Sequence, residues 1–194
     1  MKSVVRSFIA LEIAGSVRSE IEKTTRLLAE SVPAVKRMDA EQFHLTLKFL
    51  GDVPAVELHR VIRAVEAACQ TVEPFDLFFE QIGAFPDAEN PHTLWVGLTA
   101  GIDETGRLAE RINDELARLG FPKERRRLTP HLTVGRVRDS ADDAQRDALA
   151  RFLAENQQRS FGASEVVSVT IFSSELDRKG PKYDVLAEID LMQS

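Results

Sequence analysis

His44-Leu45-Thr46-Leu47 begins an apolar run typical of a β-strand, and the run returns 87 residues later as His131-Leu132-Thr133-Val134. Successive side chains of a strand point to opposite faces, so the histidine and threonine of each copy share one face and the two apolar residues share the other. Each copy therefore predicts an imidazole and a hydroxyl side by side on a rigid, half-buried support. Two such pairs that face each other would make an anion site with an acid and a base.

The segments around the two copies recur at nearly the same spacing, roughly 85 to 90 residues, which indicates an internal duplication. Each repeat is predicted to run strand, helix, His-Leu-Thr strand, helix and strand, because the apolar residues follow first the period of a strand and then that of a helix. Besides the first His-Leu-Thr strand, the expected strands are 7–13, 75–82, 94–98, 128–137, 166–172 and 183–191; the expected helices are 17–28, 58–69, 102–119 and 144–153.

Alternating strands and helices predict an α+β fold rather than a nucleotide-binding parallel sheet, because the chain has no phosphate loop of the G-x-G-x-x-G or G-x-x-x-x-G-K type. A G-x-S-x-G hydrolase elbow is also absent. The duplication predicts two lobes related by a pseudo-twofold axis, each a mostly antiparallel sheet, with helices on the outer faces and a central cleft between the sheets. No Pro/Gly/Ser-rich linker separates the halves, so residues 1–194 are expected to form a single bilobal domain.

Composition limits the classes of protein that fit the chain. A hydrophobic content of 43% and a charged content of 29% are typical of a globular protein. No apolar run is long enough to span a bilayer, and the N-terminus lacks the apolar stretch of a signal peptide. We therefore expect a cytoplasmic protein with no membrane partner. We also expect the protein to be a monomer. The single cysteine, Cys69, lies on the apolar face of a predicted helix and is expected to be a buried structural thiol.

The net charge of −6 argues against a protein that coats nucleic acid nonspecifically, since such binding needs a broad basic surface. A local basic cluster nevertheless flanks the second His-Leu-Thr copy. Such a run is as often a solvated loop as a functional feature, but its position also fits a positive mouth for a small or terminal phosphate. The cluster comprises Lys123, Arg125, Arg126 and Arg127 before the copy and Arg136 and Arg138 after it.

Paired histidines and threonines fit the chemistry of a phosphodiester. Two histidines whose environments separate their pKa values supply a base for the nucleophile and an acid for the leaving oxygen. Threonine hydroxyls can donate hydrogen bonds to the nonbridging oxygens as charge develops. A metal site is the rival, because carboxylates elsewhere could converge on His44 and His131, although the sequence has no H-E-x-x-H or Cys/His cluster. The other histidines, His59 and His92, lack a threonine partner and are expected on a helix surface and in a loop.

The two motifs resemble the paired H-x-[TS]-x signature of the two-histidine (2H) phosphoesterase superfamily. Within it, the chain is similar to the RNA 2′,3′-cyclic phosphodiesterases, historically named 2′-5′ RNA ligases. One motif alone would be a weak indication, but the similarity covers nearly the whole chain. It rests on five segments in order, namely 6–11, 43–51, 93–97, 130–136 and 180–183.

The resemblance implies a metal-independent enzyme without a cofactor that opens a 2′,3′-cyclic phosphate at an RNA 3′ end, or in a small cyclic nucleotide, and leaves a 2′-phosphate. It implies that His44 is the proton donor to the departing 3′ oxygen and that His131 is the proton acceptor that activates water. Thr46 and Thr133 would bind the phosphate. Two other functions remain open. One is RNA ligation through a 2′-5′ linkage, the reverse transesterification at the same pair, and the other is nucleotide binding without turnover.

Two arginines, Arg136 and Arg126, match family positions and are expected to bind the substrate. Strict alternation would place Arg136 on the opposite face from His131, so its participation requires a bulge or the end of the strand at Gly135.

Aromatic stacking on a base is the last feature that the resemblance raises. Leu128 stands where the family often has a phenylalanine, so this chain lacks an aromatic ring there. Phe8 or Tyr183 could stack on a terminal base instead, but aromatic residues in strands are more often part of the core. Both are therefore left out of the predicted site.

Overall fold

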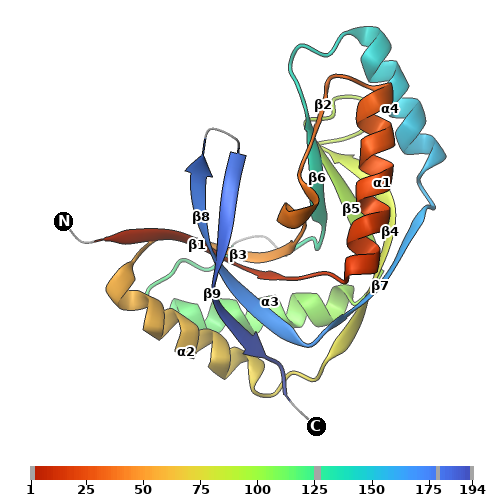
Figure 1. Ribbon diagram of the computed structural model, residues 1–194. Coiled ribbons are helices and arrows are strands. Elements are labelled where there is room, and N and C mark those ends of the chain that lie inside the picture. The colour runs from red at the N-terminus through yellow and green to blue at the C-terminus, as the bar shows by residue number, and fades with distance from the viewer. Residues whose placement is uncertain (1–2, 125–127, 178–179, 193–194) are drawn as a thin grey trace.

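The computed structural model describes residues 3–124, 128–177 and 180–192, which form two lobes set at an angle to each other (Figure 1). None of the helices in this described part is long and apolar enough to cross a membrane. The strands are β1 (Val4–Leu11), β2 (Val35–Arg37), β3 (Leu45–Pro54), β4 (Phe75–Phe85), β5 (Thr93–Ala100), β6 (Leu132–Val137), β7 (Ser160–Val166), β8 (Ser168–Asp177) and β9 (Gly180–Asp190). The helices are α1 (Gly15–Ser31), α2 (Leu58–Cys69), α3 (Ile102–Ala117) and α4 (Asp143–Glu155), with short 3-10 turns η1 (Ala40–Gln42) and η2 (Ala55–Glu57).

The described strands belong to a single sheet in the order β7-β4-β5-β6-β3-β1-β8-β9, to which β2 adds by pairing with β6. All these pairs are antiparallel. We call β1, β3, β8 and β9 with α2 and α3 the first lobe, and β2, β4, β5, β6 and β7 with α1 and α4 the second lobe. The predicted bilobal α+β fold with antiparallel strands is confirmed, but the two sheets that were predicted are parts of one sheet. The pair between Leu45 of β3 and Leu132 of β6 joins the halves into one continuous sheet.

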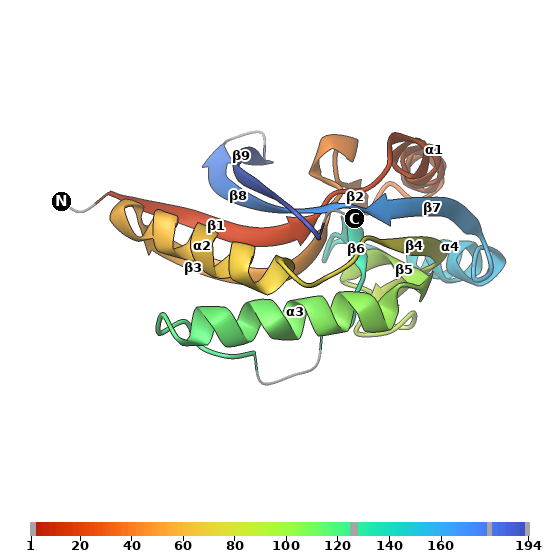
Figure 2. The same ribbon diagram turned by 90° about the horizontal axis from the view of Figure 1, so that it is seen from below.

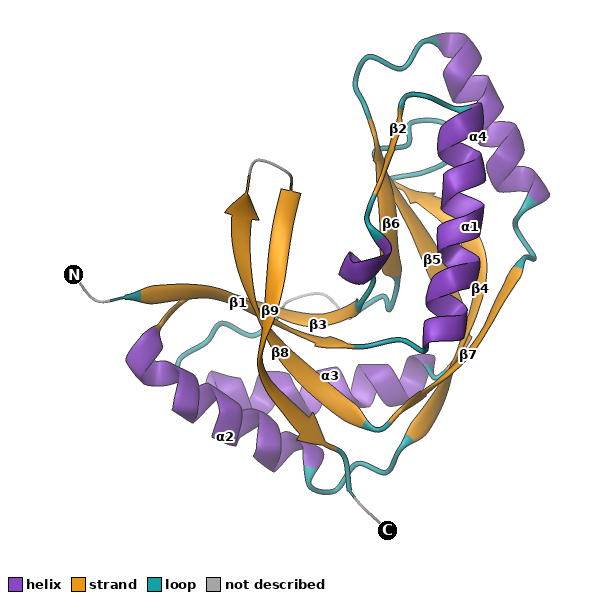
Figure 3. Cartoon of the chain, in the orientation of Figure 1, coloured by secondary structure: helices purple, strands orange, loops and turns teal. Residues whose placement is uncertain are grey.

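The two repeats exchange elements between the lobes. α1 follows β1 of the first lobe along the chain, yet it packs against β2, β7 and α4 of the second lobe. In the same way, α3 follows β5 of the second lobe but packs against α2 and β3 of the first (Figures 2 and 3). Two strands are exchanged as well. β4 comes from the first half of the sequence but pairs with β5 of the second lobe, and β8 comes from the second half but pairs with β1 of the first lobe. Neither lobe is therefore built from one half of the sequence.

Each helix buries the apolar face that its sequence predicts. In α3, the buried residues Leu108, Ile112 and Leu116 recur every fourth position, which places them on one face of the helix. In α2, Val65 and Cys69 have the same spacing. Cys69 is fully buried, as predicted, and burial raises the pKa of its thiol to about 12. The thiol is therefore protonated and serves as a small apolar group in the core.

Strand boundaries near the motifs differ from the prediction. The strand expected over 128–137 begins only at Leu132, so His131 immediately precedes β6, as His44 immediately precedes β3. Pro130 has no amide hydrogen to donate to a neighbouring strand, which explains why pairing begins after it. The sequence also fails to predict β2 and β7. β7 is inconspicuous because it contains few apolar residues and an unusual backbone at Gly162, where φ is +101°.

Candidate active site

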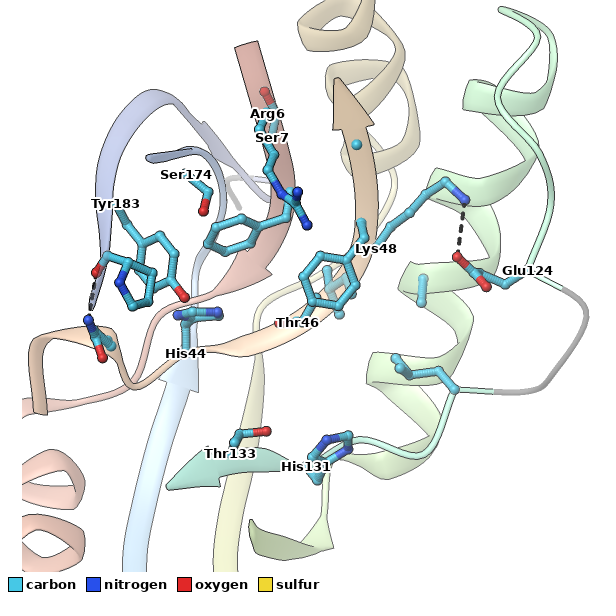
Figure 4. A pocket seen from close by; sticks show the side chains of 18 of the residues that line it. Arg6, Ser7, His44, Thr46, Lys48, Glu124, His131, Thr133, Ser174 and Tyr183 are labelled. Atoms are coloured by element: carbon cyan, nitrogen blue, oxygen red, sulfur yellow. Dashed lines mark hydrogen bonds and ion pairs between the residues drawn. The ribbon is translucent and has the colours of Figure 1, made fainter. Parts of the chain in front are cut away.

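A cleft of about 940 Å³ lies between the lobes and is lined by both His-Leu-Thr copies. His44 and Thr46 enter it at the start of β3, and His131 and Thr133 enter it at the start of β6. Figure 4 shows the two pairs facing each other across this space. The sequence prediction that the four side chains come together is therefore met in the structure.

The backbone register sets the order of these four side chains. The central leucines of the two tripeptides pair with each other and are fully buried, so the flanking residues point to the opposite face, toward the cleft. Neighbours of a paired residue lie across from each other in antiparallel strands, so His44 lies across from Thr133. By the same register, Thr46 lies across from His131. Each imidazole thus has the hydroxyl of the other copy as its neighbour.

Both imidazoles are held by the backbone two residues earlier. Nδ1 of His131 lies 2.8 Å from the carbonyl oxygen of Thr129. His44 makes a hydrogen bond with the backbone of Gln42. A carbonyl can only accept, so Nδ1 of His131 carries a proton and Nε2 is left for the substrate.

His44 sits in an aromatic pocket. Its ring stacks on Phe8 with 4.7 Å between centroids, meets the edge of Tyr183 at 5.2 Å and lies 5.9 Å from Phe172. Burial lowers the pKa of His44 from 6.5 to about 4, although the hydrogen bond with the Gln42 backbone acts in the opposite direction. Phe8 is only 3% exposed, so it belongs to the core, as expected, and offers no free face to a base.

His131 has fewer aromatic neighbours than His44. Both side chains are half-buried, but the ring of His131 meets only the edge of Phe85 among the described aromatic residues, with 5.0 Å between centroids. The two tripeptides are identical in sequence, but the aromatic packing around their histidines differs.

Two long-range contacts hold the segment that leads into His44. The side-chain amide of Gln42 donates to the carbonyl of Pro181 at 2.6 Å, which ties η1 to the start of β9. The guanidinium of Arg18 on α1 donates to the carbonyl of Ala40. Sequence reasoning missed both residues because neither belongs to a motif and both partners are distant in the chain.

A bulge brings Arg136 to the cleft. In the pairing of β5 with β6, the register shifts between Leu94 and Trp95, which leaves Val134 as an extra residue. Arg136 therefore returns to the face that carries Thr133, and it lines the cleft. The bulge that its participation requires is present.

A second bulge reverses the expected faces of β3. The register with β1 shifts between Ile9 and Ala10, so Leu47 is the extra residue. Lys48 and Phe49 both line the cleft, but Lys48 points toward α3 and is only 3% exposed, whereas Phe49 is 70% exposed. Sequence reasoning missed Phe49, because strict alternation places it on the core face.

Lys48 connects three elements at the edge of the cleft, which it lines together with Asn113 and Glu124. Its ammonium donates to Oδ1 of Asn113 on α3 at 2.7 Å and to the carbonyl of Pro122 at 2.9 Å. Glu124 lies 3.8 Å away, as the dashed line in Figure 4 marks. Burial lowers the pKa of Lys48, and Glu124 opposes that shift. The buried amine thus fixes the segment that leads toward the second motif.

Of the other residues singled out in the sequence, Leu128 and Tyr183 line the cleft, whereas Lys123, His59 and His92 do not. Arg126 lies outside the described residues. Lys123 pairs with Asp114 at 2.6 Å on the surface. His59 and His92 are exposed on α2 and in a loop, as predicted. Within residues 3–124, 128–177 and 180–192, no group of three or more His, Cys, Asp or Glu side chains is placed to hold a metal ion.

Comparison with known proteins identifies the family. The family model of the 2′-5′ RNA ligase superfamily matches residues 15–176. The chain belongs to this superfamily. It is 32% identical over 179 residues to a protein of Archaeoglobus fulgidus named RNA 2′,3′-cyclic phosphodiesterase, and the match covers 92% of this chain and 96% of the relative. The resemblance to 2H phosphoesterases that the motifs indicate is thereby confirmed.

Two solved structures share the fold. A crystal structure of a Thermus thermophilus protein superposes with a TM-score of 0.79 at 25% identity and covers 96% of this chain and 97% of its own. Escherichia coli LigT, crystallised with 3′-AMP, gives a TM-score of 0.76 at 22% identity over 98% of this chain and all of its own. The bilobal arrangement of this chain is therefore also that of these two solved structures.

Proposed function

We propose that the protein hydrolyses the 2′,3′-cyclic phosphate at RNA 3′ ends to a 2′-phosphate without a metal ion, with His44 and His131 as the acid and base. The observation that carries this proposal is the arrangement of two His-Thr pairs across one antiparallel register in a cleft. Relatives that match most of the chain are named RNA 2′,3′-cyclic phosphodiesterases, which supports the substrate.

The reaction needs one proton removed and one proton delivered. His131 takes a proton from water, whose oxygen attacks phosphorus and forms the new P–O bond. The bond between phosphorus and the 3′ oxygen breaks, and His44 delivers its proton to that oxygen. Thr46 and Thr133 donate hydrogen bonds to the nonbridging oxygens, where negative charge increases in the transition state.

The role of His44 as donor requires that it gain a proton when substrate binds. With a pKa of about 4, its imidazole is neutral near pH 7 in the free protein. An anionic phosphate placed beside the ring favours the charged form and raises the pKa. Arg136 reaches the same cleft and contributes positive charge that attracts the phosphate. Proton uptake is therefore coupled to binding of the anion.

A direct test uses an RNA oligomer that ends in a 2′,3′-cyclic phosphate, with EDTA present. We expect conversion to the 2′-phosphate by the wild type and a loss of kcat of roughly 10²- to 10⁴-fold in His44→Ala and His131→Ala. The matched control is His59→Ala, which removes an exposed imidazole outside the cleft. Full activity in either cleft variant, or loss of wild-type activity on addition of EDTA, would contradict the proposal.

The same assay separates the alternatives. When an RNA with a free 5′-hydroxyl is added, the proposal expects 2′-phosphate as the main product. Accumulation of a 2′-5′ joined RNA would instead identify ligation. Retention of the intact cyclic phosphate on the protein would identify a binding module.

A further inference from the structure

The paired ends of β8 and β9 project from the sheet beside the cleft (Figure 1). In the described register β8 pairs with β1 from Thr170 to Ser173. Residues 174–177 of β8 and 180–183 of β9 continue past that pairing, bonded to each other, and we call them the arm. Leu176 of the arm is 81% exposed, so apolar burial does little to hold this end in place.

The arm covers His44 through Tyr183. The ring of Tyr183 meets the imidazole edge-on with 5.2 Å between centroids, and it meets Phe8 edge-on at 4.9 Å. Figure 4 shows Tyr183 next to His44 at the edge of the cleft. The position of the arm therefore decides how well the imidazole is shielded from water.

Gln42 connects the arm to the segment that carries His44. Its side-chain amide donates to the carbonyl of Pro181, two residues before Tyr183, at 2.6 Å. The backbone of the same residue makes the hydrogen bond with the imidazole of His44. Arg18 of α1 in turn donates to the backbone of η1. One side chain thus ties the arm of the first lobe to a segment that is anchored on the second.

The hydrogen bond between Gln42 and Pro181 lies between two open spaces. One is the cleft, and the other is a hollow of about 340 Å³. Gln42, Pro181 and Tyr183 line both spaces, so they form part of the wall between them. If the bond breaks and the arm moves outward, the two spaces join beside His44. The hollow is also lined by Asp39, Glu41, Gly180 and Lys182.

We propose that Gln42 is a positioning residue for His44, because its hydrogen bond to Pro181 holds the arm closed over the imidazole and keeps water from the proton donor. This inference rests on the proposed function of His44. The bond itself is present in the free protein, so it can be tested without turnover.

The titration of His44 reports on the arm. Burial is the largest cause of its low pKa of about 4, so exposure of the ring to water should raise that pKa. Arg18 disfavours the charged form, Glu41 of η1 is exposed, and burial raises the pKa of Tyr183, which keeps this phenol neutral. The uncharged groups that face His44 from the other strands are Phe8 of β1, Phe172 of β8 and Thr133 of β6.

The first test uses Gln42→Met, which keeps the length of the side chain and removes the donor. We expect hydrogen exchange of the arm amides to become about fivefold faster, as for the loss of one neutral hydrogen bond. We also expect the pKa of His44, followed by NMR, to rise from about 4 to above about 5. The matched control is Gln158→Met, at an exposed glutamine in the turn after α4.

An unchanged exchange rate or an unchanged pKa in Gln42→Met would overturn the inference, and so would equal changes in Gln158→Met. Gln42→Glu separates the hydrogen bond from a role in packing, because a carboxylate has nearly the same shape but cannot donate to a carbonyl. We expect it to speed exchange of the arm at pH 7 as Gln42→Met does. Wild-type exchange in Gln42→Glu would show that only the shape of the side chain matters and would overturn the assignment.

Kinetics on the cyclic-phosphate RNA test the effect on the reaction. We expect Gln42→Met to lower kcat about tenfold at unchanged KM, because the side chains proposed to bind the phosphate lie on β3 and β6 and not on the arm. A higher KM with unchanged kcat would overturn the assignment to His44. If the wild type opens no cyclic phosphate, the proposed function fails, whereas exchange and titration still decide whether Gln42 holds the arm.

Discussion

Leu45 of β3 pairs with Leu132 of β6, and this antiparallel pair joins the two lobes at the floor of the cleft. Because both leucines are fully buried, the polar residues on either side of each one point together into the cleft. The two tripeptides therefore make a single site with alternating imidazoles and hydroxyls.

Each threonine hydroxyl lies beside the imidazole of the other copy, so we expect the two hydroxyls to be equally important. We expect Thr46→Val and Thr133→Val each to lower kcat about 10²-fold, because each removes one donor to the developing charge and keeps the side-chain shape. Steady-state kinetics on a cyclic-phosphate RNA measures the effect. Thr99→Val, at an exposed threonine of β5, serves as control. A loss confined to one cleft threonine would contradict the symmetric arrangement.

Burial of His44 makes the stability of the protein depend on pH. Its pKa is about 4 in the folded protein against an ordinary value of 6.5, so between these values the unfolded chain binds a proton that the folded chain does not. We expect this group to remove stability as the pH falls through that window, by at most about 1.4 kcal/mol per pH unit, and to contribute nothing above it.

Urea unfolding at about pH 7 and pH 5 measures this effect. The His44→Phe variant has no group that titrates at this position, so it should lose less stability than the wild type between the two pH values. Equal losses in both proteins would contradict the lowered pKa.

The buried amine of Lys48 is expected to position the second motif. Lys48→Met leaves the Asn113 oxygen and the Pro122 carbonyl without this donor, which should reduce the free energy of unfolding by about 1–3 kcal/mol. We also expect a lower kcat at temperatures where the variant is fully folded. Thermal unfolding and kinetics measure the two effects. Lys36→Met, at an exposed lysine of β2, should change neither.

Two glycines should respond to alanine in opposite directions. A Cβ at Gly83 would lie 2.3 Å from the ring of Trp95, so Gly83→Ala is expected to cost about 1–3 kcal/mol of stability as the ring moves. A Cβ at Gly106 on α3 would meet no atom within 4 Å, so Gly106→Ala should stabilise the protein by up to about 1 kcal/mol. Thermal unfolding of both variants tests the pair, and equal signs would contradict the packing described.

The sequence predicts the features of the site that depend on period and repetition. The alternation of His44, Leu45 and Thr46 is enough to place the polar pair on one face, and the second copy is enough to suggest a facing partner. Arg136 and Phe49 depend instead on bulges at Val134 and Leu47. A bulge is a mismatch in length between two strands, so one strand's own pattern does not reveal it.

The contacts that distinguish the two histidines could not be predicted from the sequence either. The aromatic pocket around His44 is assembled from β1, β8 and β9, and Gln42 finds its partner 139 residues away. Periodicity shows which face of α1 or α3 is apolar, but it does not show which sheet that face covers. Only the three-dimensional structure therefore shows that the helices are exchanged between the lobes.

Because of that exchange, we expect that half of this chain does not fold on its own. A fragment ending near Asp87 would contain β1, β3 and α2 of one lobe, but its α1 and β4 would have lost the strands and helix that cover them. In the complementary fragment, α3 and β8 would likewise have lost the elements of the first lobe against which they pack. The two pieces should recover native structure only by complementation, and a half-length ancestor with this connectivity would have had to be a domain-swapped dimer.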